Sequence, residues 1–120
     1  MSNAEVFRTY LERFTGGDVE GAADLLVDEF RFDGPILQAG SKAEFLAGST
    51  AAAQIARGCV IHHQWVDGEA VCSIYDFELE TPAGAGSIPM AEWAVVRGGK
   101  LVSSRLIFDT AAMAALMPAG

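Results

Sequence analysis

Hydrophobic residues near the start of the chain recur every three to four positions, which is the spacing of a helix buried on one side. These residues are Val6, Phe7, Tyr10, Leu11 and Phe14. Ser2 precedes them and Glu5 stands three positions later, a combination typical of a capping box at a helix start. We therefore expect a first helix that runs to about Thr15 and stops at Gly16-Gly17.

A second helix and an interrupted strand are predicted next. Asp18 can cap the helix, whose apolar stripe would be Val19, Ala22, Ala23, Leu26 and Phe30. The run from Phe30 to Leu37 is strand-like but is broken by Gly34-Pro35, with Asp33 beside the break. Such an interruption favours a bulged or edge strand over a central one.

A third helix is predicted from the pair Ser41 and Glu44, which forms another candidate capping box, to Gly58. Its buried stripe would be Phe45, Leu46, Ser49, Ala52, Ala53 and Ala56. Nearly all of the chain after this helix is expected to form strands.

Two strand-like runs flank Asp67-Gly68, a pair of residues typical of a tight hairpin turn. A two-residue turn there pairs Val66 with Glu69 and, further out, His63 with Cys72. Alternation in the second strand places Cys72, Ile74, Asp76 and Glu78 on one face, and Val71, Ser73, Tyr75, Phe77 and Leu79 on the other. Both faces carry apolar residues, so we expect helices to cover one and a partner subunit the other.

A second hairpin is predicted around Gly98-Gly99, because glycines tolerate the positive φ angles of a primed turn. Counting outward from the turn places Trp93 opposite Ser104. The next pair outward is Glu92 opposite Arg105. If these two side chains touch, the cation stabilises the carboxylate, and Glu92 should be ionised.

The predicted elements follow the order helix, helix, strand, helix and four antiparallel strands, with a short last helix capped by Asp109 or Thr110. This order predicts an α+β fold in which helices pack on one face of a bent sheet. The chain of 120 residues fits one domain, residues 1–120, large enough to bury a core without disulfides or a structural metal.

Composition narrows the classes of partner. The net charge of -8 and the lack of a Lys/Arg cluster exclude nucleic acid and anionic membranes. Cys59 and Cys72 match no metal-ligand spacing and are interpreted as buried free thiols, with a disulfide as the alternative. The chain shows no signal peptide and no apolar run near the ~18 residues of a membrane span, so we expect a soluble cytoplasmic protein.

Several stretches resemble the nuclear transport factor 2-like superfamily, and within it the SnoaL-like and ketosteroid isomerase branch. They are Tyr10-Leu-Glu-Arg-Phe-Thr-Gly-Gly-Asp18, Asp33-Gly-Pro35, Glu92-Trp93 and the closing Phe108-Asp109. The resemblance implies a cone-shaped, curved, antiparallel or mixed sheet against three N-terminal helices, with an apolar pocket inside. It also implies a homodimer formed through the outer face of the sheet.

By the same resemblance, Tyr10 falls on a tyrosine that contributes to an oxyanion hole, and Glu92 falls on the acid of that hole. Asp33 lies one residue before the position of the isomerase base, so only a bulge at Gly34-Pro35 would turn it inward. Asp76 matches a catalytic aspartate of the limonene epoxide hydrolases, but two partner positions of that family hold Ile74 and Leu106 here.

The candidate catalytic residues are therefore Tyr10, Asp33, Asp76 and Glu92. The candidate binding residues are Phe14, Phe30, Phe45, His63, Ile74 and Arg105. The leading hypothesis is a small-molecule enzyme that performs acid/base chemistry on a compact apolar substrate without a metal or an organic cofactor. Isomerase, cyclase, dehydratase and epoxide hydrolase chemistry all stay open. The alternatives are a non-catalytic ligand-binding domain and a dimeric interaction module.

Overall fold

Six strands form one curved, mixed sheet in the computed structural model, which describes residues 1–117. They are β1 (Leu26–Asp33), β2 (Gln38–Ala39), β3 (Ala56–Asp67), β4 (Ala70–Thr81), β5 (Gly84–Arg97) and β6 (Lys100–Phe108). Their order across the sheet is β2-β1-β6-β5-β4-β3, with β1 parallel to β6 and the other neighbours antiparallel. The end of the predicted domain, residues 118–120, lies outside the described part.

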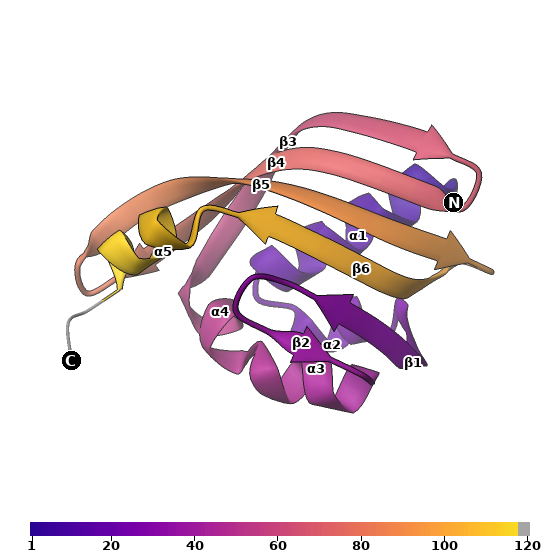
Figure 1. Ribbon diagram of the computed structural model, residues 1–120, viewed down its shortest axis with the longest axis horizontal. Coiled ribbons are helices and arrows are strands. Elements are labelled where there is room, and N and C mark those ends of the chain that lie inside the picture. Colours follow the sequence, from indigo (N-terminus) through magenta and orange to yellow (C-terminus); the bar gives the residue numbers. More distant parts are fainter. Residues whose placement is uncertain (118–120) are drawn as a thin grey trace.

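The helices are α1 (Asn3–Thr15), α2 (Val19–Ala23), α3 (Lys42–Gly48), α4 (Thr50–Ile55) and α5 (Thr110–Leu116). Figure 1 shows β3, β4 and β5 as long bent strands with α1 behind them, and α5 beside the far ends of β4 and β5. This arrangement confirms the predicted α+β class, with helices packed against a curved sheet.

Local capping signals were good predictors of helix starts. The Ser2 hydroxyl accepts a hydrogen bond from the backbone N–H of Glu5, and the Glu5 carboxylate accepts one from Ser2 in return. Asp18 and Asp109 cap α2 and α5 through their carboxylates, as predicted. Ser41 also caps α3 from its side chain.

Two predicted helix boundaries were wrong. Leu26 and Phe30 belong to β1 and not to α2, because pairing with β6 holds this segment extended. The third predicted helix is split at Ser49 into α3 and α4, and it gives way to β3 at Ala56, before Gly58.

The β3–β4 hairpin turns one residue later than predicted, at Gly68 and Glu69. Gly68 adopts the positive φ of 60° that a tight turn needs. Trp65, and not His63, consequently faces Cys72. Further along, a bulge between Ile61 and His63 leaves one residue of β3 unpaired and changes the register again.

The β5–β6 hairpin begins as predicted, with Arg97 opposite Lys100 and the residues before and after them also paired. A bulge then inserts Val102 as an extra residue in β6. Trp93 therefore faces Arg105, and Glu92 faces Leu106. The predicted pairing of Glu92 with Arg105 was wrong, because a shift of one residue turns a side chain to the other face of a sheet.

The two faces of the sheet differ sharply in exposure. The inner face, toward α1, buries the β4 residues Val71, Ser73, Tyr75, Phe77 and Leu79. The outer face leaves Cys72, Ile74 and Asp76 half-buried and Glu78 exposed. This confirms the alternation predicted for β4. No helix within residues 1–117 combines the length and the apolar character needed to span a membrane.

Candidate functional site

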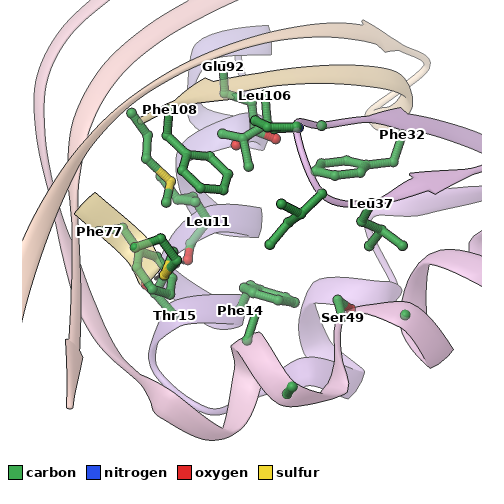
Figure 2. Close-up of a pocket in the computed structure, with 18 of the residues that line it drawn as sticks. Leu11, Phe14, Thr15, Phe32, Leu37, Ser49, Phe77, Glu92, Leu106 and Phe108 are labelled. Atoms are coloured by element: carbon green, nitrogen blue, oxygen red, sulfur yellow. Dashed lines mark hydrogen bonds between the residues drawn. The ribbon is translucent and has the colours of Figure 1, made fainter. Parts of the chain in front are cut away.

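A cavity of about 200 Å³ lies between the inner face of the sheet and the helices. Its wall comes from α1, from the turn after β1, from α3 and α4, from the inner positions of β4, β5 and β6, and from α5. Figure 2 shows Glu92 and Leu106 together at one end of the cavity, with Phe14 and Ser49 at the other.

Glu92 is the one carboxyl group among the described residues of this wall. It comes from the middle of β5 and is only 3% exposed. Tyr75 donates a hydrogen bond to its Oε1 at 2.7 Å, and Ser104 donates one to its Oε2 at 2.6 Å. Both oxygens of the carboxyl group are thus held by neutral hydroxyls.

Burial determines the protonation of this group. Removal from water raises the pKa of Glu92 above its ordinary value of 4.5, while the hydrogen bonds from Ser104 and Tyr75 offset part of that rise. Arg105, which was expected to keep Glu92 ionised, points to the opposite face of the sheet. The protonated form of Glu92 is therefore favoured relative to a carboxyl group in water.

Tyr10 contributes a second polar group to the cavity wall, from α1. Burial, and then the charge of Glu92, raise the pKa of Tyr10 well above its usual range, so the phenol keeps its proton. The Tyr75 hydroxyl is bonded to Glu92, and no such bond joins the Tyr10 hydroxyl to that carboxyl group. Tyr10 and Glu92 thus share the cavity wall, and the charge of Glu92 acts on the Tyr10 phenol.

The other hydroxyl groups of the wall are occupied within their own segments. Thr15 donates to the backbone carbonyl of Leu11 at 2.8 Å, and Ser49 donates to that of Leu46 at 3.5 Å. Polarity is consequently concentrated around Glu92, and the rest of the described wall is largely apolar.

The predicted aromatic binding residues divide between the wall and the layer behind it. Phe14 and Phe45 line the cavity with their ring centroids 6.0 Å apart. Phe30 does not reach the wall, but its ring packs edge-on against Phe45 at 5.3 Å and supports it.

Two predicted catalytic carboxylates lie outside the cavity, which corrects their expected placement. Asp33 is on the outer face, 61% exposed at its side chain, with its carboxylate 3.9 Å from the Arg105 guanidinium. Asp76 is also on the outer face, and its Oδ2 lies 3.0 Å from Nε2 of His62. The bulge in β3 between Ile61 and His63 brings His62 to this face.

Three predicted binding residues share the outer face with them. His63 stacks on Trp65 with ring centroids 5.6 Å apart, and Ile74 lies opposite His63 in the sheet. Arg105 completes the group from β6. None of these three lines the cavity, because each occupies an outward position of its strand.

Sequence reasoning missed two residues that contact Glu92. The alternation of β4 assigns Tyr75 to the buried face, which was a usable signal for a cavity position. Ser104 carried no such signal, since the unbulged pairing put it opposite Trp93. Within residues 1–117, no three His, Cys, Asp or Glu side chains gather closely enough to hold a metal ion.

Solved structures share this fold at low sequence identity. A nuclear transport factor 2-like protein of unknown function from Burkholderia pseudomallei superimposes with a TM-score of 0.85 at 21% identity, covering 99% of this chain and 100% of that one. A putative SnoaL-like polyketide cyclase from Jannaschia gives 0.82 at 16% identity, covering 98% and 92%. A protein with a ketosteroid isomerase-like fold from Catenulispora acidiphila, in complex with trimethylamine, gives 0.82 at 12% identity, covering 93% and 91%.

Sequence comparisons give the family. None of the curated protein sequences compared with this chain matches it. The family model for the SnoaL-like domain matches residues 7–104, which is most of the chain. The structural neighbours include proteins described by the same family and fold names, which confirms the resemblance seen in the sequence. The chain therefore belongs to the SnoaL-like domain family.

Proposed function

We propose that this protein is a small-molecule enzyme in which Glu92 transfers a proton and Tyr10 donates a hydrogen bond to an oxygen of the substrate. The observation that carries the proposal is a buried carboxyl group with a raised pKa and a protonated tyrosine hydroxyl in the wall of one apolar cavity. Buried titratable groups in clefts are frequent at catalytic sites. The family membership supports a cyclase or isomerase class of reaction.

The size and polarity of the cavity suit a compact, mostly apolar and cyclic substrate. A volume of about 200 Å³ excludes large ligands, and the apolar wall excludes highly charged ones. A single oxygen of the substrate would lie toward Glu92 and Tyr10, where the polar groups are concentrated. This placement aligns the ligand along the cavity.

A single carboxyl group, that of Glu92, is enough to take a proton from the substrate and to return it. In its ionised form Glu92 takes a proton from a carbon beside a carbonyl group of the substrate, which leaves an enolate, and the carboxyl group so formed returns the proton to another atom. Tyr10 donates a hydrogen bond to the enolate oxygen, which carries negative charge between the two steps. The net result is an isomerisation or a cyclisation without loss of atoms. A raised pKa suits this role, since general acid–base groups work best near the operating pH.

Hydrogen–deuterium exchange tests the proposal on any ligand that carries an acidic C–H bond beside a carbonyl group. Small cyclic ketones and esters are incubated with the protein in D₂O, and deuterium in their C–H positions is followed by NMR. We expect exchange with the unmodified protein, a loss of about 10²–10⁴-fold in Glu92→Gln, and about 10²-fold in Tyr10→Phe. Asp76→Asn is the matched control, because its carboxylate lies on the outer face.

A non-catalytic binding domain is the second candidate. The observation in its favour is that both oxygens of Glu92 are already hydrogen-bonded by Tyr75 and Ser104. A ligand that binds in the cavity but never exchanges its protons would favour this function. Exchange that persists in Glu92→Gln would also contradict the catalytic role of that residue.

The outer face supports a second proposal, that the protein pairs with a second copy of itself through this surface. Large apolar side chains are exposed there, including Trp65 at 56%, Trp93 at 53% and Ile107 at 61%. Exposed apolar patches of this kind mark interaction surfaces more often than free surface. Analytical ultracentrifugation provides the test, with a dimer as the expected species.

A further inference from the structure

Charge is distributed unevenly on the outer face, along the line that runs from β1 to the far part of β4. Arg31 and Arg105 lie near one end, on the two parallel strands β1 and β6. They border a shallow groove of about 510 Å³ that Trp93 and Ser103 also line. We call Arg31 and Arg105 the basic corner. Asp33 lies 3.9 Å from Arg105, and no ion pair within 4 Å joins Arg31 to a described residue.

The opposite end of this face is acidic. Asp76, Glu78 and Glu80 follow one another at alternate positions of β4, so their side chains lie on the same side of the strand. We call them the acidic row. The Asp76 carboxylate is hydrogen-bonded to the His62 imidazole, whereas the side chains of Glu78 and Glu80 are exposed to solvent.

An apolar row separates the two charged ends. Ile74 of β4 pairs with Ala91 of β5, which pairs with Ile107 of β6. Arg105 precedes Ile107 by two residues in β6, so it lies on the same face and to one side of this row. Asp76 follows Ile74 by two residues in β4, which runs in the same direction as β6, so it lies to the other side. The row is thus central to the surface.

We propose that the two copies of the dimer are set in register by charge, with the basic corner of each copy against the acidic row of the other. A twofold axis through the apolar row exchanges the two ends of the face, so one arrangement makes both charged contacts at once. The apolar rows meet at the centre of the contact and the charges lie at its rim, as in other protein interfaces. This inference rests on the dimer proposed above.

Charge reversal on each side, followed by mixing, tests the register. Arg31→Glu with Arg105→Glu makes both ends of the face acidic, and Glu78→Lys with Glu80→Lys makes both basic. We expect each double variant alone to dimerise about tenfold more weakly or worse, because like charges then face each other twice. The mixture of the two should restore the dimer, since both contacts in the mixed pair become attractive again.

The matched control is Arg8→Glu with Arg13→Glu, which alters net charge equally but lies on α1, behind the inner face. It should leave the dimer unchanged, and far-UV circular dichroism checks that every variant is folded. An equal weakening in this control, or a mixture that does not re-form dimers, overturns the register. If neither charge reversal weakens the dimer, the proposed register is overturned, but the proposal of a dimer is not. An unmodified protein that sediments as a monomer overturns both proposals.

Discussion

The inner and outer faces of the same sheet treat a carboxyl group in opposite ways. On the inner face, Glu92 is 3% exposed, has two hydroxyl partners and has its pKa raised. On the outer face, Asp76 is about one-third exposed at its side chain and lies against an imidazole. Solvent stabilises the charge of the second group, while burial disfavours the charged form of the first.

This difference shows that the face of the sheet on which a carboxyl group lies, more than the type of acidic residue, decides whether it can act on a ligand in the cavity. Asp76 and Glu92 lie on neighbouring strands, β4 and β5, and both interrupt apolar runs. Strand alternation directs one toward the cavity and the other toward solvent. Three measurements should separate the faces, in decreasing order of expected effect.

The largest contrast should come from aromatic side chains. Phe30→Ala removes a ring with no exposed surface that supports Phe45, and it should cost about 3–5 kcal/mol of unfolding free energy. Trp65→Ala removes a larger ring from the outer face, 56% exposed in a single copy, and should cost less than about 1 kcal/mol at protein concentrations low enough to keep the copies apart. Urea denaturation of both variants checks this, and similar losses would contradict the assignment of the faces.

The second contrast is in the pH dependence of stability. The pKa of Glu92 is raised in the folded protein, so the folded state holds its proton after the unfolded chain has lost it. Stability should therefore fall as pH rises above the ordinary value of 4.5, by up to about 1.4 kcal/mol per pH unit from this group. The fall should end once pH exceeds the folded pKa.

Glu92→Gln should remove that component, so that unfolding free energies of the variant and the unmodified protein diverge as pH rises. Denaturation at a series of pH values checks the slope. Glu78→Gln serves as the control, because an exposed carboxyl group should leave the slope in place. A slope unchanged in Glu92→Gln would show that burial does not keep this group protonated.

The smallest effect should follow from breaking the outer pair. Asp76→Asn removes a contact between two partly exposed side chains and should lower the unfolding free energy by less than about 1 kcal/mol. Thermal denaturation of the variant and of the unmodified protein in the same buffer measures the loss. A loss of several kcal/mol would place Asp76 among the buried acids instead.

Elements with strong local signals could be predicted from the sequence. The capping box at Ser2 and the carboxylate caps at Asp18 and Asp109 each fix a helix start through neighbouring residues alone. The two-residue period of β4 likewise separated the buried residues from the outer ones. Tyr10 and Glu92, which the resemblance placed at one site, both line the cavity, and their catalytic roles stay predictions.

Features set by distant pairing could not be predicted in the same way. Leu26 and Phe30 fit both a helical stripe and a strand, and only the pairing of this segment with β6 decides between the two. Both hairpins carry bulges, and nothing in the local pattern marked where the extra residue would fall. The bulge in β6 reversed the face expected for Arg105, and the changed register of β3 moved His63 from Cys72 to Ile74 on the same face.

The extra residue Val102 has a consequence for how this site can change in evolution. Loss of its single codon would remove the bulge but leave the pairs beyond it unchanged, with Arg105 opposite Trp93 and Leu106 opposite Glu92. The pairing of Arg105 with Glu92 would need Val102 to stay in the chain and to pair with Val95, so the bulge keeps the arginine out of the cavity wall. Relatives that lack only this residue are therefore expected to keep the same groups around the buried carboxyl group.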